Sequence, residues 1–288
     1  MKPPMTAPDI LAIGSRNLRH NKLVAVAIFV LGVIVFSAFF SNLMAPHDPY
    51  VTEIALRNSP PMTPSTDGGF PHVLGTDALG RDVLSRIIFG GRISLLVGFM
   101  SVIVSGLFGF LMGLLAGYFG GKVDTLIMRF VDLQMSMPSL LIALLVLYIL
   151  GPSLVNVVLI LAVTRWMVYA RVTRGMMLTL REELYVDASK ALGASHLRTI
   201  FRHMVPNLMA PILVVATLEL AIMLLTEASL SFLGLGIQPP LSSWGLMLSQ
   251  GREYLTTAWW LVAMPGIAIL LTTLSINLIA TWLRVSTR

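Results

Sequence analysis

Long apolar runs alternate with shorter polar segments along most of this chain. Six runs are long enough to cross the roughly 30 Å hydrocarbon core of a bilayer as helices, at about 1.5 Å per residue. They cover residues 23–45, 93–119, 130–150, 154–170, 208–229 and 261–283. The pattern therefore predicts an all-α integral membrane protein with six transmembrane helices.

Composition supports a membrane protein. Of the 288 residues 56% are hydrophobic and only 12% are charged, whereas soluble domains carry about a quarter of charged residues. The absence of cysteine excludes disulfides, thiolate zinc sites and cysteine nucleophiles. Common hydrolase and metalloprotease motifs are also absent. We therefore expect a protein without catalytic residues, and a membrane-embedded enzyme is a remote alternative.

The six runs divide the chain into parts. Residues 1–22 form a polar N-terminus and residues 284–288 a short tail. The longest soluble segment is 46–92, in which we expect a short amphipathic helix over 82–89 near the membrane surface. Residues 93–283 form a five-helix core, with a loop at 120–129, a proline kink at Pro138 and a short surface helix over 245–258.

A polar, basic segment, YVDASKALGASHLRTIFRHMVPN at residues 185–207, interrupts the apolar core. Such a segment cannot lie in hydrocarbon and must form a loop at one membrane face. Its apolar spacing predicts two short helices separated at Gly193, the second ending at Pro206. A helix pair held at a membrane surface is either a docking device or an interfacial helix resting on lipid headgroups, and the pattern leaves both open.

The same segment resembles the coupling loop of ABC importer permeases, in the branch for dipeptides, oligopeptides and nickel. The family pattern is Glu-Ala-Ala, three residues, Gly, nine residues, then an apolar residue, any residue and Leu-Pro. Here Asp187-Ala188-Ser189, Gly193 and Val205-Pro206 have matching spacing, whereas His203 replaces the apolar residue. Residues 72–98 and 229–266 are similar to this branch as well.

The resemblance implies the type I ABC importer permease fold, with a cytoplasmic coupling loop at 171–207 that contacts an ATP-hydrolysing subunit. The docking residues that it implies are Tyr185, Asp187, Ala188, Ser189, Ala191, Leu192, Gly193 and Pro206. It also implies alternating access, a second related permease, two ATP-binding subunits and a periplasmic or lipid-anchored solute-binding protein. Di- or oligopeptides are the expected substrate, and nickel or another small solute is the alternative.

No cofactor is expected on this chain, because the resemblance assigns ATP and magnesium to the partner subunits. Gly120-Gly121-Lys122 lacks the glycine at position 116 and the Ser or Thr at position 123 of a phosphate-binding loop. The net charge of +6 indicates membrane orientation and no nucleic-acid partner. Six spans would place 14 of the 20 Lys and Arg residues on the side of the termini and of residues 185–207, and five on the other. The positive-inside rule then predicts that both termini and this loop are cytoplasmic, in a bacterial inner membrane.

Arg165, Glu219 and Glu227 are charged residues within the predicted spans four and five. Each would cost at least a few kcal/mol if unpaired at mid-bilayer. Arg165 and Glu219 have similar depths, so we expect them to form an ion pair that either lines a substrate path or locks two helices. Glu227 lies nearer the outer end, where we expect it to reach water.

The histidines, His20, His47, His72, His196 and His203, show no metal-ligand spacing. The sequence therefore predicts no metal site.

Overall fold

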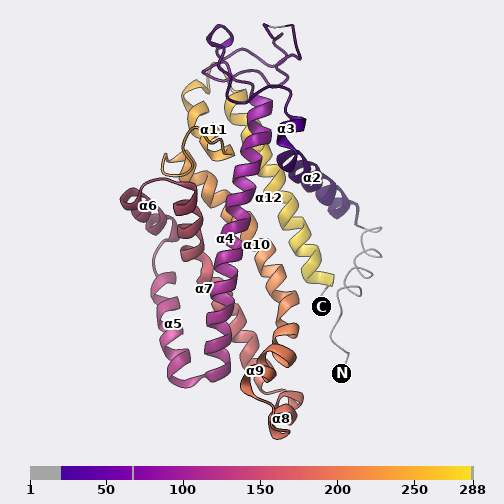
Figure 1. Ribbon diagram of the computed structural model, residues 1–288, viewed down its shortest axis with the longest axis vertical. Coiled ribbons are helices and arrows are strands. Elements are labelled where there is room, and N and C mark those ends of the chain that lie inside the picture. Colours follow the sequence, from indigo (N-terminus) through magenta and orange to yellow (C-terminus); the bar gives the residue numbers. More distant parts are fainter. Residues whose placement is uncertain (1–20, 67, 287–288) are drawn as a thin grey trace.

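The computed structural model describes residues 21–66 and 68–286, and every regular element in these ranges is a helix. Most of the predicted N-terminal segment 1–22 and the end of the tail lie outside the described residues. Within these described ranges, five helices are long and apolar enough to cross a membrane, and a sixth span exists if one sharply bent pair is counted as one. The predicted all-α membrane fold is confirmed (Figure 1). The α-helices are α2 (Lys22–Phe39), α3 (Ser41–Met44), α4 (Val83–Phe119), α5 (Gly121–Met135), α6 (Ser139–Leu150), α7 (Leu154–Arg181), α8 (Leu184–Ala191), α9 (His196–Arg198), α10 (Val205–Phe232), α11 (Trp244–Gly251) and α12 (Trp260–Ser286), joined by the short helices η1 (Ile54–Leu56), η2 (Thr199–Met204) and η3 (Arg252–Tyr254).

Helix α4 is one of the two longest continuous helices of the described chain. Asp82 caps its N-terminus by accepting a 2.7 Å hydrogen bond from the backbone N–H of Ser85. Its 37 residues extend about 55 Å, well beyond the bilayer core. The separate amphipathic helix predicted for residues 82–89 is wrong, because these residues form the first turns of α4.

Small residues allow α4 to lie directly against α7. A Cβ atom added at Gly109 or Gly113 would overlap the carbonyl oxygens of Trp166 and Ala170, respectively. Gly117 lies equally close to Met177. The four-residue spacing of these glycines therefore serves the close backbone packing expected of small residues in membrane helices.

The third predicted span is broken. Helices α5 and α6 meet at an angle of 85° across residues 136–138. Pro138 cannot donate a backbone hydrogen bond, and it stands immediately before α6. The loop predicted at 120–129 is also wrong, because α5 is already helical from Gly121. Polar residues such as Lys122 and Asp124 make α5 amphipathic, so its first part carries no long apolar run.

Helix α11 is buried at the end of the molecule where α4 begins. Trp244 is 2% exposed, and its indole N–H donates a 2.9 Å hydrogen bond to the carbonyl of Ile87 in α4. Gly245 lies against Ala228 of α10. The prediction of a surface helix over 245–258 is therefore wrong: the segment folds back between α4, α10 and α12.

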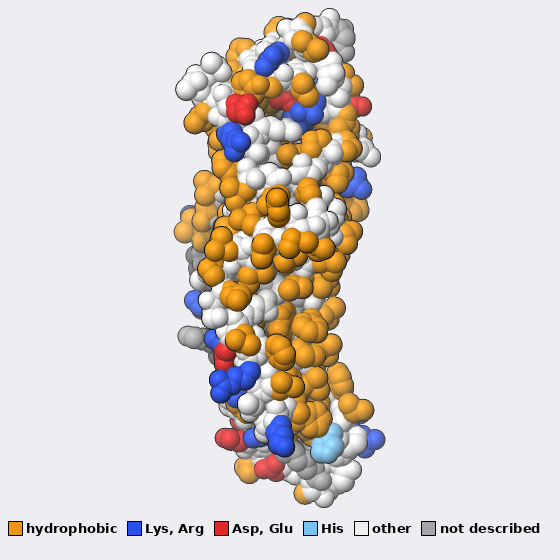
Figure 2. Space-filling model, turned by 90° about the vertical axis from the view of Figure 1, so that its left-hand side faces the viewer, with side chains coloured by type: hydrophobic (Ala, Val, Ile, Leu, Met, Phe, Trp, Pro, Cys, Tyr) orange, Lys and Arg blue, Asp and Glu red, His pale blue; other side chains and the backbone are white. Residues whose placement is uncertain are grey.

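The polar segments gather at the two ends of an elongated bundle. The chain between α3 and α4 lies with α11 at one end, and α8 and α9 lie at the other (Figure 1). Hydrophobic side chains cover the middle of the face in Figure 2, whereas charged side chains gather toward both ends. This distribution is that of a protein embedded across a bilayer.

Candidate functional site

The segment at residues 184–204 forms a helical hairpin at one end of the bundle. Helix α8 stops before Gly193, whose φ of +80° lies in the left-handed region that favours glycine. The first predicted short helix and the break at Gly193 are confirmed. The prediction of a second short helix that ends at Pro206 is wrong, because α9, η2 and α10 continue as one helix from His196 to Phe232. Pro206 lies in the first turn of α10.

The inner face of this hairpin is anchored to the bundle. Val186, Ile200 and Met204 are buried in a cluster that includes Leu114 of α4 and Met177 of α7. These contacts join both arms of the hairpin to the two long helices. The hairpin is therefore packed firmly against the bundle, and its position is coupled to that of α4 and α7.

Polar contacts reinforce the anchoring. The hydroxyl of Tyr118, near the end of α4, lies 2.7 Å from Nδ1 of His196. The amide of Asn207 donates a 3.1 Å hydrogen bond to the hydroxyl of Tyr185. Burial raises the pKa of Tyr185 above its ordinary value, so this phenol stays neutral at physiological pH.

The hairpin also carries large apolar side chains that no other described part of the chain covers. Leu192, beside the turn, is 89% exposed. Leu184, Leu197 and Phe201 are exposed as well. Exposed apolar groups that cluster on a protein surface mark interaction sites.

All but one of the predicted docking residues lie on this hairpin. Asp187, Ala188, Ala191, Leu192 and Gly193 are exposed, and Tyr185 and Ser189 are half-buried. Pro206 is exposed but belongs to α10. The family pattern does not include Leu184, Leu197 or Phe201. Only the structure shows that these three side chains are exposed while their apolar neighbours are buried.

Two of the three charges singled out in spans four and five form an ion pair. Arg165 of α7 donates from Nε to Oε2 of Glu219 in α10 and from Nη2 to Oε1, both at 2.7 Å. The Glu219 side chain is 5% exposed and that of Arg165 is 22% exposed. This forked geometry is the strongest form of a carboxylate–guanidinium contact, and it joins α7 to α10.

The third charge, Glu227, does not reach water. It is 1% exposed, and it accepts hydrogen bonds from Ser231 at 2.7 Å and from Ser94 of α4 at 3.3 Å. Ser94 in turn accepts a 3.2 Å hydrogen bond from the backbone N–H of Trp244. The expectation of a solvated Glu227 is wrong, because α11 folds over this position and closes it.

Comparison with known proteins assigns the family. Residues 109–288 match the binding-protein-dependent transport system inner membrane component, and residues 13–61 match the N-terminal transmembrane domain of oligopeptide transport permease C. The chain belongs to the binding-protein-dependent ABC importer permeases. It is therefore a non-catalytic membrane subunit of an importer that works with ATPase and substrate-binding partners.

Several relatives match this permease over nearly its full length. The di/tripeptide transport system permease protein DppC of Pseudomonas aeruginosa is 42% identical, over 98% of this chain and 93% of the relative. The dipeptide transport system permease protein DppC of Bacillus subtilis is 37% identical, over 92% of this chain and 81% of the relative. The probable D,D-dipeptide transport system permease protein DdpC of Escherichia coli is also 37% identical, over 93% and 87%.

Solved structures support the permease fold. A chain of the inward-facing MetNI methionine ABC transporter superposes with a TM-score of 0.55 at 18% identity, covering 70% of this chain and 97% of the other. A chain of an amino acid ABC transporter gives a TM-score of 0.54 at 17% identity, covering 69% and 92%. These similarities concern the fold alone.

Proposed function

We propose that this permease moves di- and oligopeptides across the bacterial cytoplasmic membrane by alternating access. A second, related permease would form the other half of the path. Two ATP-binding subunits would drive it, and a periplasmic or lipid-anchored binding protein would deliver the peptide. Support for a peptide substrate comes from relatives at 37–42% identity that are named for dipeptides or for di- and tripeptides.

Growth of a deletion strain tests the substrate. An amino-acid auxotroph that lacks this gene should not grow when the required amino acid is supplied as a dipeptide or longer peptide, and should grow on the free amino acid. Reintroducing the gene should restore growth on peptides. If growth on peptides is unaffected by the deletion and a nickel-dependent enzyme loses activity at limiting nickel, the substrate is nickel and the proposal fails.

The hairpin at residues 184–204 would be the docking site for an ATP-binding subunit. The observation that carries this role is the uncovered apolar surface of Leu184, Leu192, Leu197 and Phe201, on a hairpin whose other face is fixed to α4 and α7. Burying one such side chain contributes about 1.5–3 kcal/mol. An ATP-driven movement of the partner would then displace the helices directly.

A charge placed on the apolar surface tests docking. Leu192→Asp should leave the permease inserted and folded, because the side chain has few contacts, and should reduce co-purification of the ATP-binding subunits by at least about tenfold. Ile54→Asp is the matched control, because Ile54 is also strongly exposed but lies between α3 and α4, at the other end. Equal recovery of the ATP-binding subunits with both variants would exclude docking at this surface.

We also propose that the hairpin and both termini face the cytoplasm. The supporting observation is the excess of Lys and Arg on the side of residues 185–207. Because the chain has no cysteine, single cysteines at Leu192 and Ile54 can be labelled without background. A membrane-impermeant maleimide added to intact spheroplasts should label the cysteine at 54 and not the one at 192. The reverse pattern would invert the topology.

The Arg165–Glu219 pair is proposed to border the translocation path. The Glu219 side chain is sealed within the bundle, whereas the Arg165 side chain is partly exposed in the single chain. A partly exposed arginine at mid-bilayer is unfavourable against lipid, so it calls for a polar path or a second permease beside it. Loss of peptide uptake in Arg165→Met/Glu219→Leu, with normal assembly, is the expected result. Uptake at the wild-type rate would leave the pair only a structural role.

A further inference from the structure

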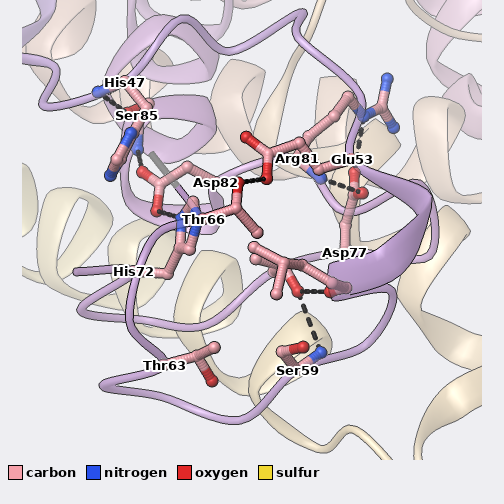
Figure 3. Close-up of polar contacts among 12 residues, drawn as sticks. His47, Glu53, Ser59, Thr63, Thr66, His72, Asp77, Arg81, Asp82 and Ser85 are labelled. Carbon is pink, nitrogen blue, oxygen red and sulfur yellow. Dashed lines mark hydrogen bonds and ion pairs between the residues drawn. The ribbon is translucent and has the colours of Figure 1, made fainter. Parts of the chain in front are cut away.

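Three side chains from separate segments meet at the end of the molecule where α4 begins. His47 follows α3, His72 lies in an isolated β-bridge with Thr63, and Asp82 caps α4. One potential ligand atom from each lies within 4.8 Å of the others. The rings of His47 and His72 stack with centroids 4.5 Å apart. Figure 3 shows the three residues together on one side of a group of polar contacts, with Ser85 between His47 and Asp82.

Each imidazole in this group has a nitrogen without a hydrogen-bond partner. His72 is 3% exposed, and the Nε2 atoms of both His47 and His72 are buried without a partner. Leaving a buried polar atom unpaired costs about 1–3 kcal/mol. Two such atoms on adjacent rings need an explanation that hydrogen bonding among the described residues does not supply.

The remaining contacts prepare His72 to act as a metal ligand. Its Nδ1 lies 2.9 Å from Oδ1 of Asp82, and a carboxylate in this position accepts the Nδ1 proton and leaves the lone pair on Nε2. Metal-binding histidines are commonly oriented in this way. The other oxygen of Asp82 accepts from the backbone of Ser85, and the Ser85 hydroxyl accepts from the backbone N–H of His47. Asp82 and Ser85, at the start of α4, therefore position the His72 ring and the backbone of His47.

We propose that Nε2 of His47 and Nε2 of His72 bind one divalent transition-metal ion of the zinc class, with Asp82 orienting His72 through its Nδ1 proton. Imidazole nitrogens suit Zn²⁺ and are poor ligands for Mg²⁺ or Ca²⁺. The two rings lie 28° from parallel, so both side chains must rotate before their Nε2 lone pairs can meet one ion. The negative charge of Asp82 balances part of the charge of the ion.

The bound ion would connect the end of the first span to the start of the second. His47 comes directly after α3, and Asp82 begins α4. The ion would thereby pin the segment between them, which contains His72, onto the bundle. Metal bound to the folded state stabilises that state by mass action. The segment between His47 and Asp82 should therefore become more resistant to proteolysis when zinc is present.

The test uses the whole importer complex, purified through a tag without histidine and treated with EDTA. Zinc affinity is measured by competition with a fluorescent chelator, and Co²⁺ is added separately to record its visible absorption. His47→Gln is the main variant because His47 is only half-buried; His72→Gln is the second. His203→Gln is the matched control, since His203 lies in η2 at the opposite end.

We expect the wild type and His203→Gln to bind one Zn²⁺ per permease and to give the intense Co²⁺ bands of a tetrahedral site. His47→Gln should bind zinc at least about tenfold more weakly and lose the Co²⁺ bands, with the melting temperature in EDTA unchanged. If His72→Gln fails to fold, the result with His47→Gln decides. Equal zinc affinity of His47→Gln and the wild type would overturn the proposal, as would absence of zinc binding to the wild type.

Discussion

Removing one partner of the Arg165–Glu219 pair should destabilise the permease far more than removing both. In Glu219→Leu, the carboxylate that accepts two 2.7 Å hydrogen bonds from Arg165 is lost. The guanidinium then remains charged within a membrane span without its carboxylate partner. In Arg165→Met/Glu219→Leu, neither charge remains and both replacements are apolar.

The magnitude follows from the burial of the two groups. Breaking a buried ion pair by deleting one partner costs about 3–5 kcal/mol, whereas replacing both partners with apolar residues is roughly neutral. Because the Arg165 side chain keeps 22% of its exposure, we expect the lower end for Glu219→Leu, about 3 kcal/mol. That loss raises the unfolded fraction roughly a hundredfold and lowers the melting temperature by about 5–10 °C.

Thermal unfolding of the purified complex in detergent measures this difference. The Arg171–Asp132 pair provides the control, because its side chains are 49% and 59% exposed at a similar distance of 2.6 Å. Exposed pairs contribute only about 0–1 kcal/mol, so Asp132→Leu should melt within about 2 °C of the wild type. The reasoning is refuted if Glu219→Leu melts with the wild type, or if the double variant melts as low as the single one.

Two further substitutions test close packing and the hairpin turn. Gly113→Leu should prevent α4 from reaching α7, because even a Cβ atom would overlap the carbonyl of Ala170, and it should reduce the yield of folded protein severalfold. Gly106→Ala, where the nearest atom would be 3.5 Å away, should be tolerated, and an equal yield from both would contradict the packing. Gly193→Pro cannot adopt a φ of +80°, so peptide-stimulated ATPase activity of the complex should disappear while membrane insertion is unchanged. Gly193→Asn, which tolerates this conformation, should keep most of that activity, and wild-type stimulation in Gly193→Pro would argue against coupling through this turn.

Much of the fold could be predicted because it depends on local patterns. Hydrophobic length located five of the spans, and the apolar spacing around Gly193 predicted the first arm of the hairpin and its break. The approximate depths of Arg165 and Glu219 along their helices predicted that they meet. In each case, helical geometry converts position in the sequence directly into position in space.

What could not be predicted depends on contacts between distant segments. Glu227 is kept from water by α11 and by Ser94, which is 133 residues away in the chain, and no local pattern records such a contact. His47 and His72 lie in irregular chain, where residue spacing says nothing about separation. Pro138 predicts a kink, but the presence of a proline does not reveal that α5 and α6 meet at 85°.

The geometry of α4 and α7 makes a prediction about coupling. The glycines of α4 place its backbone against α7, and the buried cluster of Val186 and Met204 attaches the hairpin to the ends of both helices. Because close-packed interfaces do not deform continuously, we expect α4 and α7 to move as one body. Spin labels on single cysteines at Leu111 of α4 and Val163 of α7, both exposed positions, should keep their separation when the complex binds ATP. A change of about 5 Å, one helical turn, in a complex that still hydrolyses ATP in response to peptide would mean that the helices slide, and the hairpin would then drive only one of them.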